Sequence, residues 1–253
     1  MLGAERVTKI IDILNERGSV KIDELADKFR VSSMTIRRDL EKCRRMGLIH
    51  RCYGGAISKD EVIGESEYNE KISSHKKDKK KIAAYCARLV HTGDSVYLDA
   101  GTTSLAIAEA LCDTPNISVI TNDLRIALLL SSRRVSVTML GGIVQPSTFS
   151  AIGSLTVDQL RDIHVDIAFV GVSSINDDFE VTTPTSEKVF VKRAINESAD
   201  KTYLVTDFSK FHKQALHRIN NLSDFTGVIT TGAKFTEEEK SRITDSKINM
   251  IAV

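Results

Sequence analysis

From residue 76 onward, short apolar runs typical of strands alternate with segments typical of helices, and this alternation constrains the fold more than any other feature. The predicted strands cover residues 95–98, 117–121, 135–140, 166–172, 202–206, 226–230 and 248–252, and helices are predicted at 104–111, 124–131 and 186–198. Strands at this spacing predict an α/β domain with a doubly wound, mostly parallel sheet. Because ligands of such sheets bind beyond the carboxyl ends of the strands, candidate binding residues are sought there.

The first sixty residues differ from the rest in charge. Residues 1–60 hold 13 Lys and Arg against 9 Asp and Glu, whereas the remainder holds 22 against 25. The bias is sharpest between Lys28 and Lys59, where nine basic residues face only Asp39 and Glu41. A basic block beside a mildly acidic body suggests a small module that meets a polyanion, although a solvated helix face gives the same composition.

Helical periodicity within this block predicts a winged helix-turn-helix. A first helix runs to Arg17, Asp23 is expected to cap a second, and Ser32 or Ser33 caps a third that runs to about Met46. Residues 48–53 form a strand, Gly54 and Gly55 turn the chain, and residues 56–57 return it as a wing. In this layout the third helix lies in the major groove of DNA.

The predicted DNA contacts lie on the outer face of the third helix and on the wing. They are Ser32, Ser33, Thr35, Arg37, Arg38, Lys42, Arg51, Gly54 and Gly55. Arg37 and Arg38 are expected to reach phosphates or guanine edges, and Ser33 and Thr35 to donate to phosphates at the helix N-terminus. Asp39 is expected to orient one of these arginines.

Anion-binding groups follow several predicted strands of the larger domain. Asp99-Ala100-Gly101-Thr102-Thr103-Ser104 leads from a strand into a helix, where a glycine, hydroxyls and free amides suit a phosphate. One such turn alone is better explained by Thr103 or Ser104 as a simple helix cap. Further polar groups at strand ends favour a real site: Asn122, Gly141, Gly142, Gly171, Asp207 and Lys210.

The start of the third predicted helix reads Val31-Ser32-Ser33-Met34-Thr35-Ile36-Arg37-Arg38-Asp39-Leu40. Together with residues 47–51 and the wing residues 54–56, this segment resembles the DeoR/GlpR family of bacterial transcription regulators. Four motifs of the larger domain match the effector domain of that family. They are the Asp-x-Gly-Thr-Thr turn at 99–103, Thr-Asn at 121–122, Gly-Gly at 141–142 and Asp-x-Ser-Lys-Phe at 207–211. The resemblance implies a cytoplasmic repressor of a carbohydrate-metabolism operon, acting as a dimer or tetramer and controlled by a phosphorylated sugar. It also implies that Gly101, Thr102 and Thr103 bind the phosphate, with Asp99, Asn122, Asp207 and Lys210 around the rest of the ligand.

The effector domain of that family is similar to ribose-5-phosphate isomerase, which makes an enzyme the alternative hypothesis. The isomerase carries an Asp-Gly-Ala-Asp-Glu run where this chain reads Val170-Gly171-Val172-Ser173-Ser174, without carboxylates. Only Glu187 remains of the expected acids, and one acid is a poor catalyst of isomerisation. Glu187 is either a contact to a sugar hydroxyl or an exposed residue in the first turn of its helix. We therefore expect no catalytic residues, metal or cofactor, and keep a sugar-phosphate isomerase or deaminase with a nucleic-acid module as the alternative.

These patterns divide the chain into a DNA-binding domain at residues 1–57, a linker at 58–75 and an effector domain at 76–253. The lysine-rich run at residues 75–81 either opens a solvated helix or touches DNA phosphates. No apolar run is long enough for a membrane span and no secretory signal precedes the first helix. The four cysteines, Cys43, Cys52, Cys86 and Cys112, are scattered and are expected to be reduced core thiols.

Overall fold

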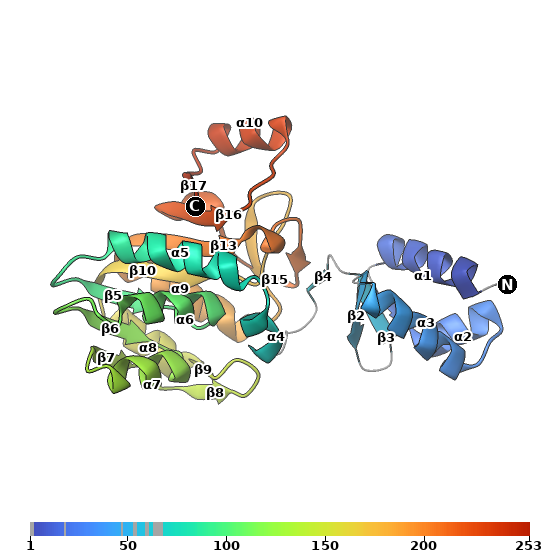
Figure 1. The fold of residues 1–253 in the computed structure, drawn as a ribbon, viewed down its shortest axis with the longest axis horizontal. Coiled ribbons are helices and arrows are strands. Elements are labelled where there is room, and N and C mark those ends of the chain that lie inside the picture. The colour runs from blue at the N-terminus through green and yellow to red at the C-terminus, as the bar shows by residue number, and fades with distance from the viewer. Residues whose placement is uncertain (1–2, 18, 47, 53–54, 59–60, 63–67) are drawn as a thin grey trace. The chain divides into compact units, whose positions relative to one another are not determined.

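The computed structural model describes residues 1–253 except 1–2, 18, 47, 53–54, 59–60 and 63–67. The chain divides into two compact units, Met1–Ile63 and Gly64–Val253. The division falls inside the predicted linker. Each unit is described by itself (Figure 1).

The N-terminal unit is a winged helix-turn-helix. Its elements are α1 (Gly3–Arg17), β1 (Ser19–Lys21), α2 (Ile22–Phe29), α3 (Ser33–Arg45), β2 (Ile49–Cys52), β3 (Gly55–Ser58) and β4 (Glu61–Val62). The first three strands form an antiparallel sheet in the order β1-β3-β2. Strand β1 was not predicted from the sequence.

Local sequence explains the ends of these helices, with one correction. Ser32 is the N-cap of α3, and its side chain accepts from the Thr35 amide. The prediction that Asp23 caps α2 is wrong: that helix begins at Ile22, so Asp23 lies inside its first turn. Gly55 is required in β3, since a Cβ there would lie 2.0 Å from the carbonyl oxygen of Val20.

The C-terminal unit is built on a seven-stranded sheet in which every described strand pair is parallel. The strand order is β17-β16-β13-β10-β5-β6-β7. The strands are β5 (Ser95–Leu98), β6 (Ser118–Thr121), β7 (Ser136–Met139), β10 (Val165–Gly171), β13 (Ala199–Asp207), β16 (Gly227–Thr231) and β17 (Met250–Ala252). This confirms the predicted doubly wound sheet, with element ends that differ from the prediction by a few residues.

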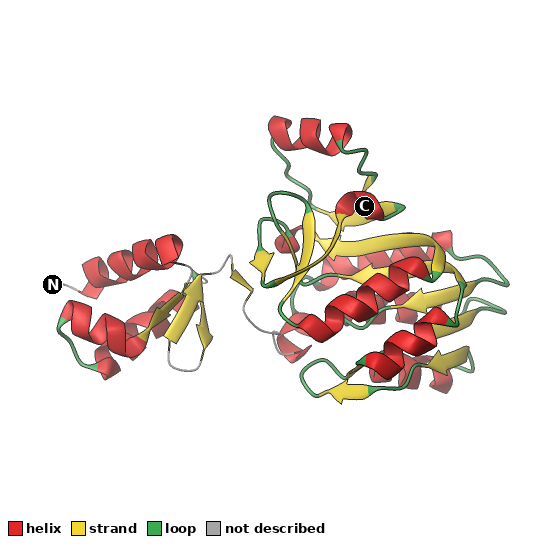
Figure 2. Cartoon of the chain, turned by 180° about the vertical axis from the view of Figure 1, so that it is seen from behind, coloured by secondary structure: helices red, strands yellow, loops and turns green. Residues whose placement is uncertain are grey.

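Helices cover both faces of this sheet (Figures 1 and 2). On one face α5 (Lys76–Leu89), α6 (Thr102–Leu111) and α7 (Leu124–Ser132) bury a core with alternate strand residues such as Val96 and Leu98. On the other face α8 (Ser154–Arg161), α9 (Ser186–Glu197) and α10 (Glu237–Asp245) pack with the intervening residues, such as Tyr97. The alternation along each strand therefore places one apolar layer on either side of the sheet.

Several short elements were not predicted. They are the helices α4 (Tyr68–Ser73), α8 and α10, strand β4, the hairpin of β8 (Ile143–Gln145) and β9 (Ser150–Ile152), an antiparallel sheet of β11 (Ser174–Ile175), β12 (Glu180–Thr183) and β15 (His217–Asn221), strand β14 (Gln214–Ala215), and the 3₁₀ turns Phe208–Lys210 and Leu222–Asp224. Among the described helices none is long and apolar enough to cross a membrane. Cys43 and Cys86 are free and buried, as expected of core thiols, whereas Cys112 is free but partly exposed. The side chain of Cys52 lies outside the described parts of the structure.

Candidate functional site

The outer face of α3 carries the basic side chains singled out from the sequence. Arg37, Arg38 and Lys42 are exposed, while Ile36, Leu40 and Cys43 on the opposite face are completely buried. The buried stripe fixes the rotation of the helix, so the guanidinium groups of Arg37 and Arg38 project away from the core. Met34 is 68% exposed in the first turn of the same helix. It was not singled out, although an exposed apolar side chain there suits contact with a thymine methyl group.

Asp39 does not orient Arg37 or Arg38 as predicted. Its buried carboxylate accepts from the Nε of Arg6 on α1, at 2.5 Å, and both side chains are nearly enclosed. The residue faces inward because it lies three positions after Ile36 on the helix. Asp39 therefore joins α3 to α1 and holds the outer face of α3 in place.

Other predicted DNA contacts differ in availability. The hydroxyl of Ser33 donates to Asp23 at 3.3 Å, whereas the Ser32 hydroxyl lies 3.0 Å from that of Thr35 at the exposed start of the helix. The side chain of Arg51 and the residue Gly54 lie outside the described parts of the structure. Gly55 packs against β1, so its small size is explained by the fold of the wing.

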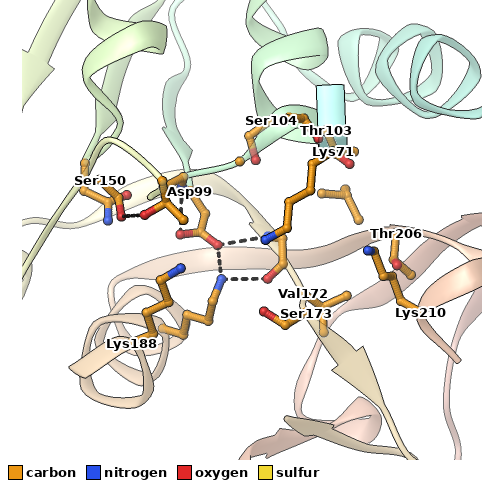
Figure 3. Close-up of a pocket in the computed structure, with 18 of the residues that line it drawn as sticks. Lys71, Asp99, Thr103, Ser104, Ser150, Val172, Ser173, Lys188, Thr206 and Lys210 are labelled. Carbon is orange, nitrogen blue, oxygen red and sulfur yellow. Dashed lines mark hydrogen bonds and ion pairs between the residues drawn. The ribbon is translucent and has the colours of Figure 1, made fainter. Parts of the chain in front are cut away.

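In the larger unit, a pocket lies beyond the carboxyl ends of β5, β10 and β13 (Figure 3). Its volume is about 90 Å³, several times the roughly 10–15 Å³ that one water molecule requires. Eight of the predicted effector residues line it: Asp99, Gly101, Thr102, Thr103, Asn122, Gly171, Asp207 and Lys210. The pocket thus stands where the parallel sheet predicts a ligand.

A buried ion pair forms the floor of this pocket. The ammonium of Lys192, on α9, donates to Asp99 Oδ2 and to the carbonyl oxygen of Gly171, the latter at 2.7 Å. The Asp99 carboxylate also accepts from the backbone amides of Ala100 at 2.8 Å and of Gly171 at 3.0 Å. These contacts tie β5, β10 and α9 together and leave Asp99 well supplied with donors.

The turn from β5 into α6 is open toward the pocket. Gly101 has φ 148°, and a Cβ at this position would meet nothing within 4 Å. Its amide donates to the buried carboxylate of Asp123 at 3.1 Å, which also caps α7 through Arg125 and Ile126. Burial raises the pKa of Asp123, and the three amides oppose that shift.

The first turn of α6 presents polar groups that have not found protein partners. Thr102 and Thr103 line the pocket, and the buried hydroxyl of Ser104 has no hydrogen-bond partner in the described part of the chain. A buried polar atom without a partner costs free energy. The free amides of a helix N-terminus and such a hydroxyl together suit an anion.

Five lysines line the pocket: Lys71, Lys79, Lys188, Lys192 and Lys210. Four of them were missed by the sequence analysis. Lys188 and Lys192 could have been recognised as a pair in the sequence, because residues four positions apart lie on the same face of a helix. Burial lowers the pKa of Lys210 to about 8, with Lys71 and Lys79 adding repulsion and Asp207 opposing the shift.

Lys79 corrects the interpretation of the lysine-rich run. Lys76, Lys77, Lys80 and Lys81 are exposed on α5, as a solvated helix requires. Lys79 is buried, and its ammonium donates to the carbonyl oxygens of Lys71 and Ser74, the latter at 2.9 Å. It thereby fastens the end of α4 beside the pocket.

Three predicted effector residues lie outside the pocket lining. Glu187 is exposed and bonded to the Ser186 hydroxyl, because the pocket face of α9 passes through 188, 191 and 192. The Gly141 amide donates to Gln159, and a Cβ on Gly142 would lie 2.2 Å from the Thr156 hydroxyl oxygen. These two glycines therefore serve close packing against α8 and β9.

Asn122 lines the pocket with its amide already engaged. Its oxygen accepts from the Tyr97 hydroxyl at 3.1 Å, and its nitrogen donates to the carbonyl of Ala151 at 3.0 Å. Burial raises the pKa of Tyr97, so this hydroxyl stays protonated as a donor. No group of His, Cys, Asp and Glu among the described residues is arranged to hold a metal ion.

Comparison with protein families finds two matches that together span most of the chain. Residues 6–62 match the DeoR-like helix-turn-helix domain, and residues 74–232 match the DeoR C terminal sensor domain. The division between the two compact units, after Ile63, falls in the gap between these matches.

Relatives of similar length are named as transcription regulators. The Escherichia coli K12 protein YgbI, an uncharacterized HTH-type transcriptional regulator, is 37% identical over 91% of this chain and 90% of its own length. The glycerol-3-phosphate regulon repressor of Haemophilus influenzae is 34% identical over 94% and 95%. A putative aga operon transcriptional repressor of Escherichia coli O157:H7 is 32% identical over 85% and 81%.

Solved structures with a similar fold are more distant. Ribose 5-phosphate isomerase A of Methanocaldococcus jannaschii is 17% identical, with a TM-score of 0.41 over 55% of each chain. The eIF2B delta of Chaetomium thermophilum is 16% identical, with a TM-score of 0.46 over 63% of this chain and 56% of that one. Similarities this remote carry no argument about chemistry.

Proposed function

The chain belongs to the DeoR family of DNA-binding transcription regulators, and from this premise we propose that it represses a carbohydrate-metabolism operon under the control of a phosphorylated sugar. The observation that carries the proposal is the convergence of five lysines around an open turn and the N-terminus of α6. The glycerol-3-phosphate regulon repressor and the putative aga operon repressor among its relatives support the same class of regulated pathway.

In this proposal α3 enters the major groove of the operator. The exposed guanidinium groups of Arg37 and Arg38 contact guanine edges or phosphates, with Lys42 at the backbone. One helix-turn-helix reads a single half-site, so the protein binds as a dimer or tetramer to symmetric half-sites.

The phosphate of the effector lies over Gly101, where the first-turn amides of α6 and the hydroxyls of Thr102 and Thr103 surround it. The proposal is supported by the buried Ser104 hydroxyl, which an anion would supply with an acceptor. An effector that releases the operator must bind the DNA-free protein more tightly than the DNA-bound protein.

We also propose that the pocket binds its ligand without turning it over. The carboxylate of Asp99 receives an ammonium and two backbone amides, and that of Asp207 accepts from the Ser209 amide at 2.9 Å. Both carboxylates are thus already engaged by donors of the protein itself, whereas sugar isomerisation needs a base that reaches the sugar carbons. Direct assays with pentose and hexosamine phosphates test this, and turnover that depends on Asp99 would contradict it.

The proposed operator binding by α3 is tested with a DNA duplex that the protein itself selects from genomic fragments. The Arg37→Ala and Arg38→Ala double variant is expected to lose operator binding in a fluorescence anisotropy titration while its far-UV circular dichroism is retained. A matched double variant, Lys76→Ala and Lys77→Ala on exposed α5, removes the same charge. Equal losses in the two variants would contradict the assignment of α3.

The proposed binding of a phosphorylated sugar is tested by a thermal-shift screen that compares phosphorylated sugars with their unphosphorylated counterparts. A ligand that binds the folded protein raises the melting temperature, and only phosphorylated members are expected to do so. The isosteric Thr102→Val and Thr103→Val double variant should lose the shift, whereas Thr138→Val, exposed on β7, should keep it. A full shift in the double variant would show that the phosphate binds elsewhere.

A further inference from the structure

Helix α4 joins the pocket to the part of the chain that leads to the smaller unit. The helix begins at Tyr68, five positions after Ile63, where the smaller unit ends, and it packs against α6. Lys71, on this helix, and Ser74, just after it, both line the pocket. Of the described residues that line the pocket, these two are the nearest in sequence to the DNA-binding unit.

The C-terminal end of α4 is held by the larger unit. The buried ammonium of Lys79, on α5, donates to the carbonyl oxygens of Lys71 and Ser74, the latter at 2.9 Å. Between the two helices His75 adopts the left-handed conformation, with φ 51° and ψ 33°, which is uncommon for a residue other than glycine. Because His75 interrupts the helical path, α4 is a separate short helix that Lys79 holds at one end.

The side chain of Lys71 extends from α4 toward the floor of the pocket. Figure 3 shows its ammonium pointing toward Asp99, which lies two residues before Gly101. The Asp99 carboxylate is shared with Lys192 and with two backbone amides. A phosphate monoester carries about −1.5 to −2 charges at pH 7. At equal distance it therefore attracts the Lys71 ammonium more strongly than this shared carboxylate does.

We propose that Lys71 binds the phosphate of the effector, and that this contact moves α4 and so transmits occupancy of the pocket toward the DNA-binding unit. The inference rests on the proposed function, because it takes a phosphate to lie over Gly101 and to release the operator. Lys71 then sets the coupling between the two sites as well as contributing to affinity. Lys188 also lines the pocket, but it belongs to α9, a helix far in sequence from the division between the units, and it contributes to affinity alone.

The test compares Lys71→Met with Lys188→Met, since both lysines are half-buried in the pocket lining. The probe is the compound, among glucose 6-phosphate, ribose 5-phosphate, glycerol 3-phosphate and inorganic phosphate, that raises the melting temperature of the unsubstituted protein most. Isothermal titration calorimetry gives the affinity of each variant for the probe, and far-UV circular dichroism checks its fold. Fluorescence anisotropy gives the affinity for the selected operator duplex without the probe and at saturating probe, at one ionic strength.

Both variants are expected to bind the probe more weakly, because each loses one cation from the pocket. At saturation the probe should weaken operator binding at least about fivefold in the unsubstituted protein and in Lys188→Met, but less than about twofold in Lys71→Met. A lysine that contributed affinity alone would keep the full effect once the pocket is saturated. The comparison therefore separates coupling from binding.

Each other outcome overturns a defined part of the account. The full effect of the probe in Lys71→Met would refute the coupling role of Lys71, and equal loss of the effect in both variants would refute its assignment to α4. Unchanged affinity of Lys71→Met for the probe would refute the contact with the phosphate. If no compound raised the melting temperature, or if the probe left operator binding by the unsubstituted protein unaltered, the proposed function itself would be refuted, so the two failures are distinguishable.

Discussion

Replacing Lys192 by methionine is expected to destabilise the larger unit by about 3 kcal/mol, the lower end of the range for breaking a buried ion pair. The side chains of Lys192 and Asp99 are only 8% and 3% exposed, so the remaining carboxylate would stay buried without its cation. The two backbone amides that donate to Asp99 persist and limit the loss. Methionine has a similar length and fills the same space, so the change reports the lost charge.

The free-energy loss translates into a large thermal shift. For a unit of this size each kcal/mol corresponds to roughly 2–4 °C, so the melting temperature should fall by about 6–12 °C. Adding Asp99→Asn to Lys192→Met removes both charges, and the double variant should recover most of the lost stability. This recovery separates electrostatics from packing.

Urea denaturation followed by far-UV circular dichroism measures the effect, because the chain contains no tryptophan for fluorescence. Lys201→Met on exposed β13 surface is the matched control and should change the unfolding free energy by less than about 0.5 kcal/mol. A loss below about 1 kcal/mol for Lys192→Met, or a double variant no more stable than the single one, would refute this reasoning.

Three further predictions follow from the same contacts. Asp39→Asn leaves the buried guanidinium of Arg6 without its carboxylate and should destabilise the N-terminal unit by about 3 kcal/mol in urea denaturation; an unchanged midpoint would contradict the role of this pair. Gly101→Ala should weaken binding of a phosphorylated ligand in calorimetry because its methyl group enters the pocket, whereas Gly93→Ala, equally open at φ 99°, should leave affinity unaltered. Because burial lowers the pKa of Lys210 from 10.5 to about 8, the unfolded state holds more protons between these values, and stability from this group rises with pH there. Lys210→Met should therefore be more stable than the unsubstituted protein at pH 7 and lose that advantage by pH 10; a constant difference in urea midpoint would contradict the shifted pKa.

Regular elements could be predicted because their patterns are local. The short apolar run at Ser95–Leu98 predicts a buried strand, and Val96, Tyr97 and Leu98 are indeed buried. The helical stripe of Ile36, Leu40 and Cys43 is likewise visible in the sequence and buried in the structure. The strands of the small antiparallel sheet have two to five residues each, too few for a periodic signal, so they were missed.

The pocket was only partly predictable because much of it depends on contacts between distant residues. Lys192 lies in an apolar stretch of α9 where a buried lysine is rare, and its partner Asp99 is 93 positions away. Glu187 was predicted to contact the effector because it is acidic, although it lies one residue outside the face of α9 that lines the pocket. Gly142 was interpreted as a ligand loop because sequence does not distinguish an approach to a ligand from an approach to Thr156.

The central claim is that one chain carries a DNA-binding surface and a coupled pocket for a phosphorylated ligand. The most direct measurement is a fluorescence anisotropy titration of the selected operator duplex with and without a phosphorylated compound that raises the melting temperature. We predict that the compound weakens operator binding by at least about fivefold, within the usual range of coupling free energies, and that Thr102→Val with Thr103→Val removes this effect. A compound that stabilises the protein through these threonines and leaves operator affinity unchanged would contradict the claim.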